Sequence, residues 1–187
     1  RKVSQNEKTN LVQEVFSKVA SKYDVMNDVM SFGTHRLWKK ELVDYMNIQP
    51  SDKIIDVGSG TGDLINLIFK KKINENIYSV DLNQEMLNLS KKRFINKKIK
   101  FVKANAEKLP FENNLFDKYV IAFCLRNVTN IDKSIKEAHR VLKPGGSFFC
   151  LEFSKPQSEI VALIYNNYKR SIIPWLGNII TKNKSAY

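Results

Sequence analysis

The stretch KIIDVGSGTGDLI, residues 53–65, constrains the fold more than any other part of the chain. A short run of apolar and acidic residues at 54–57 leads directly into three of the seven glycines of the chain, and a helical apolar pattern begins at Asp63. The three glycines occupy alternate positions, Gly58, Gly60 and Gly62. This order is typical of a buried strand, a tight turn and a helix, which is the first unit of a parallel α/β sheet.

The same alternation continues along the chain. Runs rich in β-branched and aromatic residues occur at residues 53–57, 77–81, 99–103, 118–123 and 147–153. Helical patterns lie between them at residues 63–71, 84–94 and 131–142, and KPGG at residues 143–146 ends the last of these. Continuously apolar strands that alternate with helices predict a parallel sheet covered on both faces. The fold class is therefore α/β, with a doubly wound, Rossmann-like sheet.

Helical patterns also flank the predicted sheet. Two precede it, at residues 7–22 and 35–46, and the second has an apolar stripe of Leu37, Trp38, Leu42 and Met46. We expect residues 1–50 to form an N-terminal helical cap and residues 51–187 the core of one domain. A further helix is predicted at residues 160–175, with no strand pattern after it. We therefore expect the sheet to lack its C-terminal strands.

Composition excludes some functions and leaves others open. The 187 residues carry a net charge of +12, but only six of the 31 basic residues are arginine, and there is no arginine-rich stripe. A solvated lysine surface is one interpretation, and an anionic membrane surface or a polyanionic partner is the other. The lack of an arginine-rich stripe disfavours nucleic acid as that partner. Two cysteines, Cys124 and Cys150, lie in apolar runs and predict buried thiols rather than a disulfide framework.

The glycine-rich turn predicts a ligand site. Ligands of doubly wound sheets bind at the carboxyl ends of the strands, and glycine lets a ligand approach the backbone closely. A plain tight turn is the alternative. An acidic residue that ends the second strand, Asp81, would reach a ribose of either NAD or S-adenosylmethionine. The spacing G-x-G-x-G, and the carboxylates Asp56 and Asp63 beside it, favour the sulfonium and ammonium groups of S-adenosylmethionine over a pyrophosphate.

Five segments together resemble one protein family: DVGSGTGD, VDLNQEML, ANAEKLPF, LRNVTNIDKSIKEAHRVLKPGGSFFCLEFSKP and the N-terminal SKYDVMNDVMSFGTHRLWKK. They are similar to class I methyltransferases of the ubiquinone/menaquinone-biosynthesis C-methyltransferase family, over residues 15–187. The resemblance implies S-adenosylmethionine-dependent C-methylation of the ring of a polyprenyl benzoquinol of the 2-methoxy-6-polyprenyl-1,4-benzoquinol type. A menaquinone precursor, demethylmenaquinol, is the alternative substrate. An RNA-modifying methyltransferase and a non-catalytic scaffold are more distant alternatives.

The resemblance also implies the residues that bind the cofactor. The glycine loop would cradle the methionine portion, Asp81 and Leu82 would meet the ribose, and Asn105 and Ala106 would flank the adenine. Without the resemblance, a turn residue is an equally good interpretation of Asn105. The loop residues implied are Gly58, Gly60, Thr61 and Gly62. Family members often have serine where this chain has Ala122.

Four residues are candidates for the chemistry: Arg126, Asn127, Tyr23 and His35. Arginine is a poor base because its pKa exceeds 12, so we expect Arg126 to stabilise a phenolate or to order a water. Tyr23 and His35 would close over the ring. A loop-capping arginine and a helix-start histidine are the structural alternatives. The sequence contains no metal-ligand constellation, and no metal is expected.

The apolar tail of such a substrate implies a partner surface. Residues 160–182 mix aliphatic, aromatic and basic side chains, which suits either a peripheral membrane helix or a helix packed on its own domain. The resemblance further implies a homodimer or an assembly with other quinone-pathway enzymes. It implies a mitochondrial matrix location at the inner membrane, with a bacterial cytoplasm as the alternative.

Overall fold

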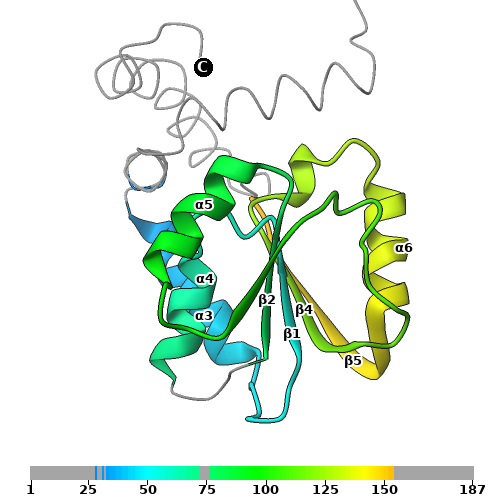
Figure 1. The fold of residues 1–187 in the computed structure, drawn as a ribbon, viewed down its shortest axis with the longest axis horizontal. Coiled ribbons are helices and arrows are strands. Elements are labelled where there is room, and N and C mark those ends of the chain that lie inside the picture. Colours follow the sequence, from blue (N-terminus) through cyan, green and yellow to red (C-terminus); the bar gives the residue numbers. More distant parts are fainter. Residues whose placement is uncertain (1–27, 29–30, 32, 72–75, 154–187) are drawn as a thin grey trace, which may run out of the picture.

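The structure is a computed structural model that describes residues 28, 31, 33–71 and 76–153. Five strands and four α-helices alternate in this part of the chain, with one short 3-10 helix (Figure 1). The helices are α3 (Thr34–Tyr45), α4 (Asp63–Lys70), α5 (Gln84–Arg93) and α6 (Ile131–Val141), and the 3-10 helix is η2 (Leu125–Asn127). The strands are β1 (Ile54–Val57), β2 (Ile77–Asp81), β3 (Ile99–Lys103), β4 (Phe116–Ala122) and β5 (Leu142–Leu151). The predicted alternation is confirmed.

The strands form one sheet in the order β3-β2-β1-β4-β5, and each neighbouring pair is parallel. Strand order therefore reverses direction between β1 and β4, as in a doubly wound fold. Figure 1 shows α3, α4 and α5 on one side of the sheet and α6 on the other. The predicted doubly wound α/β class is confirmed, and the carboxyl ends of β1 and β4 lie side by side.

Each face of the sheet has its own apolar core. Ile54 faces the cluster that includes Val43 of α3 and Ile65 of α4, whereas Ile55 faces the cluster that includes Val141 of α6. Successive side chains of a strand point to opposite faces, so a strand with both faces covered has all of its side chains buried. All four residues of β1 are buried for this reason.

Helix α3 turns a different face inward from the one its apolar residues predict. Leu37 is 62% exposed and Trp38 is 38% exposed, whereas His35 and Lys39 are 2% and 7% exposed. The predicted stripe is therefore wrong at Leu37 and Trp38, although Met46 is buried as expected. The buried face combines His35, Lys39 and Val43, spaced four residues apart. Two polar side chains are accommodated there because Lys39 meets an acidic partner and His35 meets a hydroxyl.

Strand β5 begins earlier than the sequence predicts. The expected break at KPGG is instead an irregularity inside the strand: Leu142 pairs with Phe116, and pairing resumes between Ser147 and Lys118. Gly145 has a φ of 80°, which absorbs the extra residues. The free thiol of Cys150 on β5 is exposed, in contrast to the buried thiol predicted, whereas that of Cys124 is well covered.

The predicted helices at residues 7–22 and 160–175 lie outside the described residues, as does Tyr23. Among the helices that are described, none is long and apolar enough to span a membrane.

Candidate functional site

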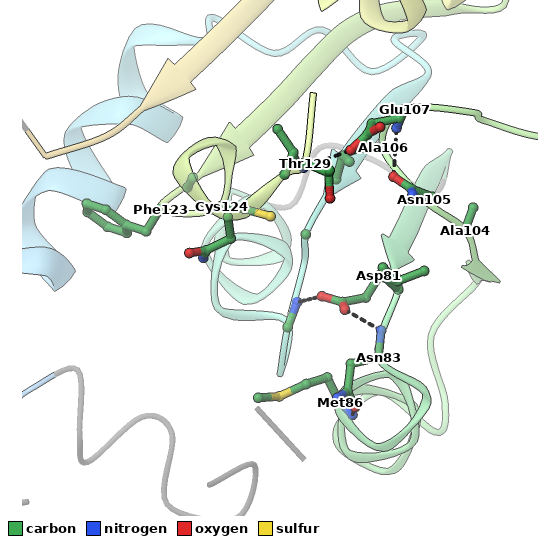
Figure 2. A pocket seen from close by; sticks show the side chains of 17 residues that line it. Asp81, Asn83, Met86, Ala104, Asn105, Ala106, Glu107, Phe123, Cys124 and Thr129 are labelled. Carbon is green, nitrogen blue, oxygen red and sulfur yellow. Dashed lines mark hydrogen bonds between the residues drawn. The ribbon is translucent and has the colours of Figure 1, made fainter. Parts of the chain in front are cut away.

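A cavity opens where the carboxyl ends of β1, β2 and β4 meet (Figure 2). About 820 Å³ of space lies between its walls, part of it open to solvent. Figure 2 shows Asp81, Asn83 and Met86 on one side of it and Phe123 and Cys124 on the opposite side. We call this the main cavity. Its lining residues are Val57, Gly58, Gly60, Asp81, Leu82, Asn83, Met86, Ala104, Asn105, Ala106, Glu107, Ala122, Phe123, Cys124, Asn127, Val128 and Thr129.

The glycine loop between β1 and α4 forms one wall of the main cavity. All three glycines have positive φ, and the backbone N–H groups of Gly58 and Ser59 donate to the carbonyl of Val80, at 2.8 and 3.0 Å. A methyl group added at Gly58 would overlap the side chain of Cys124. Gly62 caps α4 and packs against Phe94, away from the cavity lining. Glycine is therefore required for both conformation and close approach.

Asp81 ties the second strand to the glycine loop. Its carboxylate accepts hydrogen bonds from the backbone N–H groups of Gly60 and Asn83, both at 2.8 Å (Figure 2). Burial raises its pKa above the ordinary value, against the opposing effect of these backbone donors. An acceptor at this depth, on a rigid strand end, suits the diol of a ribose.

The third wall follows β3. Asn105 Oδ1 accepts a hydrogen bond from the N–H of Glu107 at 2.9 Å, so its side chain also holds the local turn. Glu107 in turn accepts from the backbone N–H groups of Thr129 and Asn130, at 2.8 and 2.9 Å. This carboxylate joins the segment after β3 to the start of α6. Ala106 is buried and contributes an apolar side chain to the cavity lining.

A smaller cavity lies on the other side of the glycine loop and shares Gly58, Gly60, Ala122 and Phe123 with the main one. We call it the side cavity. Its remaining lining residues are Lys39, Asp56, Ser59, Thr61, Asp63 and Leu64.

The two carboxyl groups of the side cavity, Asp56 and Asp63, have pKa values shifted in opposite directions. Burial, reinforced by the charges of Asp81 and Asp63, raises the pKa of Asp56 to about 7, and neither carboxylate oxygen has a hydrogen-bond partner among the described residues. Burial would also raise the pKa of Asp63, but Lys39 and Arg93 outweigh it and hold that pKa below its usual value. Lys39 Nζ lies 2.9 Å and Arg93 3.0 Å from the Asp63 carboxylate. Asp63 is therefore already paired, and Asp56 is not.

The wall opposite Asp81 is formed just after β4. Phe123 adopts a φ of 53°, which is uncommon for a bulky residue and often marks a functional turn. Its ring packs on Phe153 at a centroid distance of 4.7 Å, and Trp38 lies 6.4 and 5.9 Å from these two rings. Burial raises the pKa of the neighbouring Cys124 thiol to about 12, so it stays protonated. We call Trp38, Phe123 and Phe153 the aromatic cluster.

Arg126 adjoins this wall without lining the cavity. Its guanidinium pairs with Glu152 at the end of β5 and lies 5.2 Å from the centre of the Phe153 ring. The backbone N–H of Arg126 also donates to Glu152, at 3.2 Å. Asn127, the next residue, does line the main cavity.

His35 is not brought to either cavity. Its Nδ1 atom lies 2.8 Å from Ser31 Oγ, and its Nε2 atom lies 3.7 Å from the Asp28 carboxylate. Burial, together with the charge of Lys39, lowers its pKa, so the ring is neutral at pH 7. The structure therefore groups Gly58, Gly60, Asp81, Leu82, Asn105, Ala106 and Asn127 in one cavity, with Thr61 in the next.

Comparison with known proteins places this arrangement in a family. The ubiE/COQ5 methyltransferase family model matches residues 2–187. This chain belongs to that family. Similar curated relatives carry the name ubiquinone/menaquinone biosynthesis C-methyltransferase UbiE. They include proteins from Rickettsia bellii (48% identical), Rickettsia typhi (50%) and Caulobacter vibrioides (41%). The alignments span 100%, 100% and 96% of this chain, and 78%, 78% and 75% of the relatives.

Solved structures with the same fold are more distant in sequence. A methyltransferase from Haloferax volcanii, in complex with its Trm112 activator, matches with a TM-score of 0.66 at 22% identity, over 74% of this chain and 59% of that one. An S-adenosyl-L-methionine-dependent methyltransferase from Methanococcus maripaludis matches with a TM-score of 0.64 at 21% identity, over 84% and 73% of the two chains. They confirm the class I methyltransferase fold.

As a member of the ubiE/COQ5 family, the chain is a methyltransferase that uses S-adenosylmethionine. The residues of the site fit this donor. The buried carboxylate of Asp81 faces the main cavity, where it suits a ribose. The carboxylate of Asp56 faces the side cavity and has no hydrogen-bond partner among the described residues, so it would balance the charge of a cationic group there. A pyrophosphate would meet these carboxylates with like charge.

Several lining residues are absent from the sequence predictions: Asn83, Met86, Glu107, Phe123, Cys124, Val128, Thr129 and Lys39. Asn83 caps α5 by accepting from the backbone N–H groups of Glu85 and Met86. Its position just before a helical pattern predicts this capping role. Phe123 ends a predicted strand and Cys124 follows it, which places both at the ligand edge of a parallel sheet. Lys39 gives no such signal.

Proposed function

We propose that this chain transfers a methyl group from S-adenosylmethionine to a ring carbon of a polyprenylated quinol, in ubiquinone or menaquinone biosynthesis. The names of the curated relatives support the reaction class. The observation that carries the placement of the acceptor is the wall opposite Asp81, where the aromatic cluster and the Arg126 guanidinium adjoin the main cavity. An aromatic ring stacks favourably on such a surface.

The residues have distinct tasks in this proposal. Gly58, Gly60, Asp81 and Ala106 hold and orient the donor, which supplies an electrophilic methyl group on its sulfonium. A ring carbon becomes nucleophilic when the hydroxyl beside it loses its proton. We assign Arg126 to stabilise the resulting phenolate, because a guanidinium is always charged and is a poor base. We assign Asn127, which lines the main cavity, to hold a ring oxygen or the water that takes the proton.

The apolar tail of the substrate suggests peripheral membrane contact near the aromatic cluster. Trp38 and Phe153 are 38% and 44% exposed, and in this proposal the tail leaves the cavity past them. We propose a bacterial cytoplasm as the compartment, supported by the bacterial origin of the relatives, with the mitochondrial matrix as the alternative. A homodimer or an assembly with other quinone-pathway enzymes remains part of the proposal.

The direct test is methyl transfer from isotopically labelled S-adenosylmethionine to short-tailed substrates. We expect a reduced benzoquinol, a reduced demethylnaphthoquinol or both to gain one methyl group on a ring carbon, located by mass spectrometry. The oxidised quinones should remain unmodified, because they have no hydroxyl to deprotonate. Labelling of RNA with none on either quinol would contradict the proposal.

The role of Arg126 is tested by replacing it with alanine. We expect Arg126→Ala to leave donor affinity within about twofold and to lower kcat by about 10²–10³-fold, the usual cost of removing one group that stabilises developing negative charge. The control is Lys136→Ala, an exposed residue of α6. Equal loss of donor affinity and turnover would place Arg126 in the fold rather than in the chemistry.

A further inference from the structure

The guanidinium of Arg126 is held by the two residues that follow β5. Glu152 Oε1 accepts a hydrogen bond from its Nη1 atom, and the centre of the Phe153 ring lies 5.2 Å from its central carbon. Glu152 Oε2 also accepts from the backbone N–H of Arg126, at 3.2 Å. A long arginine side chain in solvent otherwise samples many rotamers, so an ion pair and a ring contact together select a small part of that range.

This arrangement occupies only part of the guanidinium. The group has five N–H donors in one plane. Within the part of the chain that the structure describes, its one side-chain hydrogen bond is the one from Nη1 to Glu152. The Nε and Nη2 donors are left for another acceptor, and the side chain is 44% exposed. A phenolate oxygen is an acceptor of the kind that these donors bind.

The ion pair is fixed to the sheet rather than to a free loop. Ala122 of β4 pairs with Leu151, the last residue of β5, and the N–H of Phe123 donates to the carbonyl of Leu151 at 2.7 Å. Glu152 comes directly after this pairing, and its Oε1 atom accepts from the N–H of Phe153 at 3.0 Å. The position of the carboxylate is therefore set by β4 and β5.

The same contacts connect the guanidinium to the wall of the main cavity. The Phe153 ring that contacts Arg126 also packs on the Phe123 ring, with 4.7 Å between the ring centres. Phe123 lines both cavities, and Asn127, the residue after Arg126, lines the main one. Arg126 thus has a defined place beside the cavity in which the acceptor ring is proposed to bind.

We propose that Glu152 is a positioning residue for methyl transfer, which fixes the Arg126 guanidinium so that its remaining donors are presented to the ring oxygen of the acceptor. This rests on the proposed function, in which Arg126 stabilises the phenolate. Glu152 lines neither cavity and acts through Arg126. A charge that is already in place when the phenolate forms needs no reorganisation at that moment, and a displacement of about 1 Å can cost about 10²-fold in rate.

The test is Glu152→Gln, which removes the charge but keeps the size and a carbonyl acceptor for the backbone N–H. We expect kcat with a reduced short-tailed quinol to fall by about 10- to 100-fold, while affinity for S-adenosylmethionine stays within about twofold. An unchanged kcat would overturn the proposal. An increased kcat would also overturn it, because Glu152 would then chiefly weaken the positive charge of Arg126.

Glu137→Gln is the matched control. Glu137 on α6 likewise accepts from a guanidinium, that of Arg140, and from a backbone N–H, that of Leu109, both at 2.7 Å. It lines neither cavity. We expect both variants to lower Tm by a similar amount and only Glu152→Gln to lower kcat. Equal losses of kcat in the two variants would make the Glu152 pair a structural contact and overturn the proposal.

A double-mutant cycle separates positioning from support of the fold. In a protein that already carries Arg126→Ala, we expect Glu152→Gln to change kcat by less than about threefold, because no guanidinium is left to position. A second loss as large as the one in the parent would overturn the proposal.

A measurement without turnover distinguishes failure of this proposal from failure of the proposed function. The ¹H–¹⁵N signal of Arg126 Nε is assigned by its loss in Arg126→Ala. We expect its order parameter to be about 0.85 in the parent and below about 0.6 in Glu152→Gln, the range of flexible groups. The same order parameter in both proteins would overturn the proposal. A parent that methylates no quinol, but whose Arg126 loosens in this way, would contradict the proposed function alone.

Discussion

Asp81 anchors the glycine loop, and we propose that it also accepts the ribose hydroxyls of the donor. Its two oxygens hold the N–H groups of Gly60 and Asn83, so removing the carboxylate loosens the loop as well as the ribose contact. We expect Asp81→Ala to weaken binding of S-adenosylmethionine and of 5′-methylthioadenosine alike, by about 10- to 150-fold.

Calorimetry with both ligands checks this expectation, with Asp132→Ala on the surface of α6 as the control. Unchanged affinity would remove Asp81 from the ribose site. A loss confined to S-adenosylmethionine would move it to the amino-acid end.

Asp56 makes the stability of the fold depend on pH. Burial raises its pKa from 3.8 to about 7, so the folded state holds a proton there that the unfolded state releases. Between about pH 4 and pH 7 the folded state therefore binds more protons, and the free energy of unfolding falls as pH rises. The full effect is on the order of 4 kcal/mol, reached above pH 7.

Replacing this carboxyl with an amide should abolish that dependence. We measure the free energy of unfolding of Asp56→Asn and of the parent by urea unfolding without ligand. The difference between the two proteins should favour the variant more at pH 8 than at pH 5. Asp132→Asn supplies the matched surface change. The same stability difference between Asp56→Asn and the parent at both pH values would show that Asp56 is ionised in the folded protein throughout.

The sequence predicts which residues at strand ends line the cavity better than it predicts which helix residues do. Asp81 was predictable because a strand end in a parallel sheet has a known place. Lys39 was not, because a charged residue in a helix is ordinarily assigned to the solvent face. Its burial depends on Asp63, 24 residues away, and no local pattern encodes that contact.

The loop between β1 and α4 leaves no room for a side chain at Gly58. We expect Gly58→Ala to lower both stability and donor affinity, because its new methyl group would meet Cys124 and its φ is 70°. Gly145→Ala is the matched control: its φ is 80°, but nothing lies within 4 Å, so only backbone strain of about 1–2 kcal/mol is expected.

Thermal unfolding and calorimetry on both variants separate strain from overlap. Donor affinity should fall only in Gly58→Ala. Equal effects of the two substitutions would mean that the side chain of Cys124 yields, and that the loop needs glycine for its φ alone.

The bounds of most elements were predictable to within a residue or two, because they depend on apolar periodicity and capping. Strand β2 matches its prediction, and α6 ends one residue early. The start of β5 was not predictable: KPGG reads locally as a stop, yet pairing with β4 carries the strand through it. Tertiary hydrogen bonding outweighs local turn propensity there.

For the molecule as a whole, the donor should act as a stabiliser. A ligand that binds only the folded state adds about 2.7 kcal/mol at 100 times its dissociation constant. We expect S-adenosylmethionine at that concentration to raise Tm by about 5–10 °C and NAD to leave it unchanged. Differential scanning fluorimetry measures both. A rise with NAD and none with S-adenosylmethionine would contradict the assignment of the donor.

The sheet order β3-β2-β1-β4-β5 makes formation of the site depend on folding of the whole sheet. The cavity walls come from segments spread over about 90 residues, and every strand pair that joins them is parallel and non-local. No wall can form on its own, so the site appears only when the sheet closes. Mutations far from the cavity that slow this closure should lower the amount of folded enzyme in the cell, even when every contact to the donor is intact.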